Sequence, residues 1–471
     1  MREISKEDIL KRLLFDNPWW VQGREVVIPY EQDIRRKYFN GFFRGISDTS
    51  VRRATVLMGP RRVGKTVMVY HAIRGLLDQG VDAKSILYLS LETPIYTGLS
   101  LEKILGLFQE QFGHDRNAML YCLFDEIQYL KEWEVHLKSL VDSYPNYRFV
   151  ATGSAAAALR LKSNESGAGR FSDFILPPLT FAEYLSFVRK EEQLISCTEQ
   201  GCRAIDIEGL NAEFVNYLNY GGYPEAVFSP SIRQRPEQYI KSDIIDKVLL
   251  RDLPSLYGIS DIQELNRLFT TLAYNTGSEV NLESLSKSSG VAKNTIRRYL
   301  EYLEAAFLIH RVERIDQNAK RFKRAMQFKV YLTNPSMRAA LFGQIDADAE
   351  AMGALTETAI YSQWQHHQHT ELYYARWNGG EVDIVCLPSA TQKPYWAVEV
   401  KWSDRHCKNY PELENCVEFA SRNSKLAWPF MVTTRTVDAT ASYKGVDFTF
   451  RPASLYAYTL GVNLLGEINS A

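Results

Sequence analysis

Cysteine is scarce in this sequence, which has six cysteines among its 471 residues. Cys197 and Cys202 are the closest pair, and neither a Cys-x-x-Cys motif nor a cluster of histidines accompanies them. This spacing argues against a zinc knuckle and against a disulfide framework. A chain without such bridges suits a reducing compartment, so we expect a cytoplasmic protein.

Long apolar runs and an excess of one charge are also missing. No stretch is long enough to span a bilayer, and residues 1–8 are charged and lack the apolar core of a signal peptide. The 55 basic and 56 acidic residues give a formal net charge of −1. Nucleic acid could therefore be bound only by local patches, because the whole chain exerts no attracting field. We expect a soluble protein without a membrane partner.

Internal repeats and long low-complexity tracts are likewise missing, and apolar strands alternate with helices between residues 54 and 151. Such alternation predicts a parallel sheet covered by helices on both faces. A chain of 471 residues is long enough for two to four domains, each with its own core. The expected strands lie at 54–58, 85–91, 119–124 and 147–151, and the expected helices at 67–77, 101–112 and 132–143.

Residues 59–66 read Gly-Pro-Arg-Arg-Val-Gly-Lys-Thr and fit the phosphate-binding pattern of Gly, four arbitrary residues and Gly-Lys-Thr. They lie between a predicted strand and a predicted helix, which is the setting that such a loop requires. Lys65 would supply charge to the β and γ phosphates of ATP, and Thr66 would offer its hydroxyl to Mg²⁺. The expected nucleotide-binding loop consists of Gly59, Pro60, Arg61, Arg62, Val63, Gly64, Lys65, Thr66 and Val67.

Two acidic residues follow the apolar run 119–124, at the sheet edge where ligands bind in parallel sheets. Asp125 would hold Mg²⁺ through water, and Glu126 would orient and polarise the attacking water. The apolar run 149–151 ends in the polar residues 152–154, Thr-Gly-Ser, whose hydroxyls could reach the γ-phosphate. We therefore expect ATP hydrolysis. A nucleoside kinase also begins with a phosphate-binding loop, but the paired acids and the Thr-Gly-Ser ending argue against it.

Together these motifs resemble those of AAA+ and STAND-type ATPases. More closely, they resemble the bacterial and archaeal ATPases that join an AAA core to a DUF4143 C-terminal region. Two further motifs carry the likeness, Leu-Pro-Pro-Leu-Thr-Phe-Ala-Glu-Tyr-Leu at 176–185 and Tyr-Gly-Gly-Tyr-Pro-Glu at 220–225. The resemblance covers roughly residues 45–230, and further matches extend to about residue 405.

The resemblance implies roles for three more residues. Ser154 sits at the sensor-1 position, and Pro224 would lie against the adenine of ATP. Arg170 would be an arginine finger or sensor, with Arg160 as its rival. An arginine finger supplied by a neighbouring subunit can raise the rate about 10³–10⁵-fold, and in that case the protein must assemble. We therefore expect a homo-oligomer.

The middle of the chain predicts a helix, a tight turn and a second helix over residues 282–303. Its polar residues would point outward at the start of the second helix, as in a helix-turn-helix or winged-helix recognition helix. A basic stretch at 311–329 follows and suits phosphate contacts. Double-stranded DNA is one expected partner, and a rigid protein–protein element is the alternative. The candidate nucleic-acid contacts are Lys293, Asn294, Arg297, Arg298, Lys320 and Arg321.

Four residues of the C-terminal part suggest a metal site. Glu357 lies on a predicted helix, Asp383 on a predicted strand, and Glu399 and Lys401 on the next strand. The last two are two residues apart, so on a strand they project from the same face. The carboxylates would bind Mg²⁺, and Lys401 would steady a phosphate oxygen. The set resembles the PD-(D/E)xK nuclease core assigned to many DUF4143 proteins. Glu381 is a further candidate acid, and a plain Glu399–Lys401 surface ion pair is the alternative.

The fold that follows is an α/β P-loop core with a helical lid, then a winged helix, then a small α/β nuclease-like domain. The leading function is an ATPase that couples its nucleotide state to a DNA-binding or nuclease-like C-terminal half. The alternative is a slow nucleotide-gated switch whose nuclease fold only binds. The expected boundaries are 1–45 for an N-terminal helical segment, 46–190 for the ATPase core, 191–255 for the lid, 256–345 for the winged helix and 346–471 for the nuclease-like domain.

Overall fold

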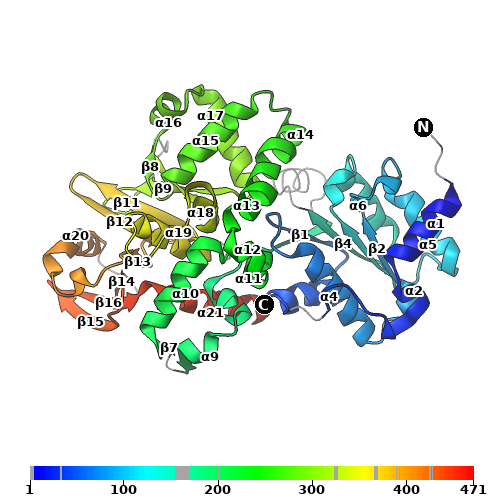
Figure 1. Ribbon diagram of the computed structural model, residues 1–471, viewed down its shortest axis with the longest axis horizontal. Coiled ribbons are helices and arrows are strands. Elements are labelled where there is room, and N and C mark those ends of the chain that lie inside the picture. Colours follow the sequence, from blue (N-terminus) through cyan, green and yellow to red (C-terminus); the bar gives the residue numbers. More distant parts are fainter. Residues whose placement is uncertain are drawn as a thin grey trace. The chain divides into compact units, whose positions relative to one another are not determined.

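The chain folds into two compact units in the computed structural model (Figure 1). Unit 1 comprises Met1–Leu176 and Glu467–Ala471, and unit 2 comprises Pro177–Gly466. The structure describes residues 5–31, 34–153, 169–199, 201–322, 327–364, 370–388, 390–391, 393–423, 426 and 428–470.

Unit 1 is built on a five-stranded parallel sheet with the order β2-β3-β4-β1-β5. Its strands are almost wholly buried except for the edge strand β5, as expected when helices cover both faces. The predicted parallel sheet is thereby confirmed. The strands are β1 (Ala54–Met58), β2 (Ile86–Ser90), β3 (Tyr121–Asp125), β4 (Arg148–Gly153) and β5 (Phe171–Ile175).

Helices of unit 1 pack on this sheet, and the N-terminal segment packs with them. The indole N–H groups of Trp19 and Trp20 both donate to the carbonyl of Ile86, at 2.9 and 2.7 Å. The segment around Trp19 and Trp20 therefore packs against β2 rather than standing apart from the core. The helices are α1 (Lys6–Asp16), α2 (Trp19–Gln22), α3 (Phe39–Ser47), α4 (Lys65–Asp78), α5 (Leu101–Phe112) and α6 (Trp133–Ser143).

Unit 2 contains a mixed nine-stranded sheet with the order β15-β16-β14-β13-β12-β11-β9-β10-β8. Strand β9 pairs with β10 on one side and, in parallel, with β11 on the other. The sheet therefore runs across the expected boundary at residue 345, and the division into five segments stays a prediction. The strands are β8 (Glu279–Val280), β9 (Ile309–Ile315), β10 (Phe328–Leu332), β11 (Leu372–Trp377), β12 (Gly380–Cys386), β13 (Trp396–Glu399), β14 (Phe430–Thr434), β15 (Ala439–Tyr443) and β16 (Val446–Pro452).

Unit 2 also contains two groups of helices, and the first group lies between residues 181 and 257. It comprises α8 (Phe181–Phe187), α9 (Glu191–Leu194), α10 (Ile207–Tyr220), α11 (Pro224–Phe228), α12 (Pro230–Gln234), α13 (Pro236–Tyr239), two π-helical segments (Ile240–Asp246 and Val248–Asp252) and α14 (Leu253–Tyr257). The second group comprises α15 (Ile262–Tyr274), α16 (Leu282–Ser289), α17 (Lys293–Ala305), α18 (Ser336–Phe342), α19 (Met352–Trp364), α20 (Glu414–Arg422) and α21 (Ala453–Ser470).

A short hairpin interrupts the first group where the sequence shows only a polar patch. Strands β6 (Ile195–Thr198) and β7 (Gly201–Ala204) pair antiparallel, with Cys197 opposite Cys202. Those two residues form a disulfide. The scarcity of cysteine excluded a framework of several bridges, but the local bridge was not anticipated, because five-residue spacing says nothing of the hairpin that aligns the pair.

Among the helices that the structure describes, none is both long and apolar enough to cross a bilayer.

Candidate functional site

The loop between β1 and α4 has the curled backbone that phosphate binding needs. Gly64 adopts a φ of +95°, and a Cβ on Gly59 would lie 2.1 Å from the carbonyl oxygen of Leu176. Only glycine tolerates both situations without strain. The ammonium of Lys65 is buried inside the curl and donates to the carbonyl of Gly59 at 3.0 Å and to that of Pro60 at 2.7 Å. The lysine is thus held at the start of α4, where the helix dipole favours anions.

Asp125, the last residue of β3, is the hub of the site. The hydroxyl of Thr66 donates to its Oδ2 at 2.9 Å, and the hydroxyl of Tyr88 donates to the same oxygen at 3.1 Å. The hydroxyl of Thr152 donates to its Oδ1. Burial raises the pKa of Asp125, and the neighbouring Glu126 charge acts in the same direction, while the three hydroxyls oppose them. Hydroxyl and carboxylate oxygens are the ligands that suit Mg²⁺.

Glu126 stands where the chain leaves β3. Its φ of +54° is in the left-handed region, which few residues other than glycine adopt. Its N–H donates to the hydroxyl of Thr152 at 3.1 Å, and the side-chain amide of Gln128 donates to its carboxylate. Glu126 is therefore oriented from both sides, next to the hub and at the carboxyl edge of the sheet.

The structure does not bring every expected catalytic residue to this edge. Ser154, like Arg160, lies outside the described residues. Arg170 precedes β5 and pairs with Asp142, and its carbonyl accepts from the N–H of Ala54 at the opposite end of β1. Within one copy of the chain, five residues of strand, roughly 16 Å, separate Arg170 from the loop. A role in a neighbouring copy stays a prediction.

Pro224 belongs to unit 2, where it opens α11. The preceding Gly222 packs so closely on the side chain of Asn334 that a Cβ would lie 2.3 Å from it. The Gly-Tyr-Pro motif thus has a packing role in its own unit, and the expected adenine contact stays a prediction.

Unit 2 brings the C-terminal candidates together around a lysine that the sequence interpretation left in a merely basic stretch. Lys329 on β10 is 3% exposed, and its Nζ lies 2.8 Å from Glu357 on α19. The same Nζ is 2.7 Å from Glu381 and 3.4 Å from Asp383, both on β12. Tyr331, two residues along the strand, donates to Glu357 at 2.5 Å. Lys329 and Tyr331 are two residues apart and so share one face of a strand. That spacing was the feature of the sequence from which their shared contact with Glu357 could have been predicted.

Glu399 and Lys401 complete this cluster on its other side. Lys401 lies 2.7 Å from Glu399 and 4.0 Å from Asp383, and the N–H of Val400 donates to Asp383 at 2.9 Å. Burial, followed by the Asp383 charge, raises the pKa of Glu399 to about 8. Burial likewise raises the pKa of Glu357 to about 7, against the lowering effect of Lys329. The Glu399–Lys401 pair is therefore largely buried and differs from the plain surface ion pair of the alternative.

A cation would fit one edge of this cluster. The Oε2 atom of Glu399 is buried and has no hydrogen-bond partner among the described residues, and such an orphaned acceptor is costly. The same part of the chain nevertheless offers no ready-made group of three His, Cys, Asp or Glu side chains that could hold a metal. The physical reason is that the ammonium of Lys329 lies between Glu357 and Asp383 and occupies the place that a metal ion would need.

The middle segment has the predicted helix, turn and helix. Gly290, at φ +75°, ends α16, and α17 begins at Lys293. Helix α15 precedes the pair, and the antiparallel strands β8, β9 and β10 form one end of the nine-stranded sheet; the winged-helix assignment stays a prediction. The polar side chains at the start of α17 are exposed, and they are Lys293, Asn294, Arg297 and Arg298.

Lys320 and Arg321 lie elsewhere. Both follow β9, and Arg321 forms an ion pair with Glu371 and stacks on the ring of Tyr373 at 4.5 Å. Arg321 is therefore engaged at the start of β11, whereas Lys320 is exposed. Their nucleic-acid contacts stay predictions, separate from those of α17.

Comparison with known proteins identifies the first of these sites. Residues 51–185 match the sequence model of a family described as an AAA domain, so this part is an AAA-type P-loop domain that binds nucleotide, typically ATP with Mg²⁺. Residues 211–348 match a family described as a domain of unknown function, DUF8612. The expected likeness to DUF4143 and its nuclease fold is not established by these matches.

Two curated relatives match somewhat under two thirds of this chain in sequence, and both are described as uncharacterized. A Haemophilus influenzae protein is 27% identical over 299 residues, which cover 62% of this chain and 70% of the relative. A Methanocaldococcus jannaschii protein is 24% identical over 325 residues, which cover 65% of this chain and 66% of the relative.

Solved structures are more distant. One is the replication initiator DnaA bound to AMPPCP and single-stranded DNA, with 13% identity and a TM-score of 0.28 over 57% of this chain and 86% of that one. Another is the Hsp104–casein complex of S. cerevisiae, with 15% identity and a TM-score of 0.30 over 64% of this chain and 54% of that one. These low TM-scores support no argument here.

Proposed function

We propose that this protein hydrolyses ATP with Mg²⁺ and that its nucleotide state controls a DNA-binding, nuclease-like C-terminal half. The observation that carries the first part is the hydrogen-bonded hub at Asp125. Thr66 of the phosphate-binding loop and Thr152 of β4 both donate to Asp125, and Glu126 is the next residue. The residues that would hold Mg²⁺ and the residue that would orient water are thus assembled at one edge of the sheet.

Each residue of the hub has a distinct task in this proposal. Lys65 balances the β and γ phosphates, while Thr66 and Asp125 would hold Mg²⁺, which neutralises charge on the phosphates when bound. Glu126 accepts a hydrogen bond from the water that attacks the γ-phosphate. Tyr88 keeps one oxygen of Asp125 in place through its hydroxyl. The proton of the water moves toward the Glu126 carboxylate, which lies next to the hub at the carboxyl edge of the sheet.

The experiment compares ATP turnover and ATP binding in the wild-type protein and in Glu126→Gln. The variant is expected to bind ATP with unchanged affinity in calorimetry and to hydrolyse it about 10²–10⁴-fold more slowly. Lys65→Ala is expected to bind no ATP. Glu132→Gln is the matched control, because Glu132 is exposed and makes no contact with the hub. Wild-type turnover by Glu126→Gln would sink the proposed role of that carboxylate.

Two observations support the second part. The exposed basic side chains of α17 present charge where a recognition helix would meet phosphates. In the C-terminal cluster, Glu399 and Asp383 would hold Mg²⁺, and Lys401 would steady the phosphate oxygen that gains charge. The buried Oε2 of Glu399 supports this assignment.

Plasmid digestion with Mg²⁺ or Mn²⁺ tests the nuclease proposal. Asp383→Ala and Lys401→Ala are expected to abolish cutting, while Asp447→Asn, an exposed change on β16, keeps it. Identical cutting by all four proteins would reject the site and point to a contaminant.

A second candidate function rests on Lys329. Its ammonium already forms ion pairs with Glu357 and Glu381. A nuclease fold that does not catalyse would need such a permanent cation in place of a metal ion. In that case the protein is a nucleotide-gated switch with slow turnover, and its C-terminal half only binds. Absence of metal-dependent cutting together with ATP-dependent DNA binding would favour this candidate.

A further inference from the structure

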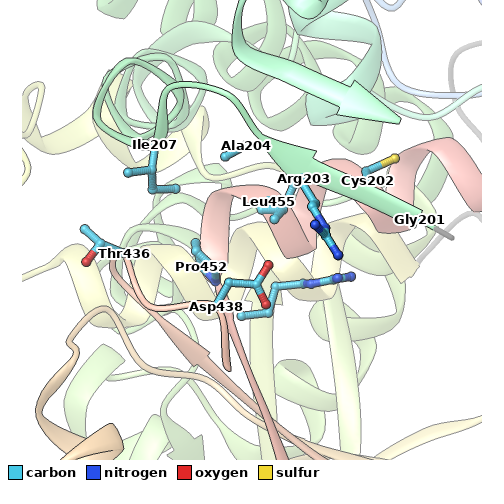
Figure 2. Close-up of a pocket in the computed structure, with 10 residues that line it drawn as sticks. Gly201, Cys202, Arg203, Ala204, Ile207, Thr436, Asp438, Pro452 and Leu455 are labelled. Atoms are coloured by element: carbon cyan, nitrogen blue, oxygen red, sulfur yellow. The ribbon is translucent and has the colours of Figure 1, made fainter. Parts of the chain in front are cut away.

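A cavity of about 520 Å³ lies within unit 2, and none of its lining residues belongs to the two sites described above (Figure 2). One wall is formed by strand β7 and the start of α10, from Gly201 to Ile207. The other wall is formed by residues 436–455, which include the end of β16 and the start of α21. Its size falls in the range of small-molecule sites, roughly 300–1,000 Å³.

The lining divides into a charged side and an apolar side. Arg203, Arg451, Asp438 and Thr436 supply the polar groups, and Figure 2 shows Arg203 and Asp438 extending toward the same space from opposite walls. The apolar side consists of Ala204, Ile207, Pro452 and Leu455. A ligand for this cavity therefore needs a charged end and a small apolar or weakly polar body.

The two guanidinium groups are available to a ligand as far as the described residues go. Among the described residues, neither Arg203 nor Arg451 forms an ion pair, although Asp438 lines the same cavity. The Nε atom of Arg451 is buried without a hydrogen-bond partner in that part of the chain. A buried donor on a permanent cation is costly when it is unsatisfied, and a guanidinium pair is suited to phosphate or carboxylate oxygens. An oxyanion in the cavity would give the Nε atom of Arg451 a hydrogen-bond acceptor.

The cavity is held in shape by contacts that do not use these arginines. Asp404 accepts from the N–H and the hydroxyl of Thr436, at 2.8 and 2.7 Å, which fixes the turn after β14. Asn211 on α10 donates to the carbonyl of Arg435 and accepts from the hydroxyl of Ser454, at 2.9 and 2.6 Å. The Cys197–Cys202 disulfide closes the hairpin that carries Arg203. The arginines are therefore available for a ligand without loss of the frame.

We propose that this cavity binds a small organic phosphate, such as a sugar phosphate, with the phosphate on Arg203 and Arg451 and a hydroxyl on Asp438. A phosphate dianion balances the two guanidinium charges. Asp438 would repel a second anionic group but would accept a hydrogen bond from a hydroxyl, which selects a hydroxylated body over free phosphate. The site is independent of the ATPase and the C-terminal cluster.

The test uses the full chain carrying Lys65→Ala, so that the phosphate-binding loop does not contribute. Calorimetry with ribose 5-phosphate, inorganic phosphate and ribose is expected to rank the three in that order, with no detectable binding of ribose. Arg203→Gln is expected to lower the affinity for ribose 5-phosphate about tenfold. The double variant that also carries Arg451→Gln is expected to lower it about a hundredfold. Arg422→Gln, which alters an exposed arginine of α20, is the matched control.

Asp438→Asn separates the two sources of phosphate. This variant is expected to bind inorganic phosphate more tightly, because a repelling charge is lost. Its preference for ribose 5-phosphate over inorganic phosphate is expected to be smaller. Equal affinity of the parent protein for the two phosphates would overturn the assignment of an organic ligand. Unchanged affinity in Arg203→Gln would overturn the site itself, and that variant is informative because Arg203 is exposed and its loss leaves the fold intact.

Discussion

The ammonium of Lys329 lies 2.8 Å from the carboxylate of Glu357 in the interior of unit 2. One partner comes from strand β10 and the other from helix α19, so the pair joins this helix to the nine-stranded sheet. The wider group contains four carboxylates, and the two ammonium groups of Lys329 and Lys401 do not balance them. The stability and the chemistry of this cluster both depend on how the remaining negative charge of the carboxylates is neutralised.

Replacing Lys329 by methionine should destabilise the protein strongly. The substitution keeps the volume but leaves Glu357 and Asp383 without their buried cation, and breaking a buried pair costs about 3–5 kcal/mol. Chemical denaturation, followed by a probe in unit 2, measures this as a lower midpoint with an unchanged slope. Lys320→Met is the control, since Lys320 is exposed. A loss under about 1 kcal/mol for Lys329→Met would contradict the expectation.

Stability should depend on pH through Glu399. Because its pKa is raised to about 8 by burial and Asp383, the folded protein holds a proton that the unfolded chain releases near its ordinary value of about 4.3. The free energy of unfolding therefore falls as pH rises through this interval. In EDTA, Glu399→Gln should flatten this decline between about pH 5 and 8 without removing it, since Glu357 also titrates there, at about 7.

Denaturation midpoints across that interval measure the effect, with Glu350→Gln as an exposed control. A steeper decline in Glu399→Gln than in the wild type would show that the carboxylate is already ionised and stabilised in the folded protein.

DNA binding, if it uses α17, should lose salt dependence when its arginines are removed. Each phosphate contact contributes a slope of about −0.9 to the logarithm of affinity against the logarithm of salt. Arg297→Ala with Arg298→Ala should therefore reduce the slope by about 2 in gel-shift titrations at several salt concentrations. Arg267→Ala on α15 is the control. Affinity of the wild-type protein that is indifferent to salt would exclude phosphate-driven binding through this helix.

Sequence reasoning is most informative where the residues concerned are contiguous in the chain. The phosphate-binding loop and Asp125–Glu126 are short runs next to apolar strands, so the parallel sheet that they imply carries them to one edge. It missed Tyr88, whose hydroxyl reaches Asp125 only because β2 and β3 are neighbours with Ser90 beside Asp125. It also missed that Lys329 belongs with Glu357 and Asp383, since that grouping depends on the order of strands in a nine-stranded sheet.

The amino-acid sequence alone determined the nucleotide-binding loop, because glycines, a lysine and a threonine at fixed spacing act through their own local backbone. Tertiary structure decided the rest. It placed Arg170 at the opposite end of β1 from the phosphate-binding loop, enclosed Lys329 among carboxylates and brought Arg203 and Arg451 to one cavity, where Asp438 forms no ion pair with either among the described residues. Those outcomes depend on which distant segments become neighbours in the folded protein. The pattern of residues along the chain does not show which of them will be in contact.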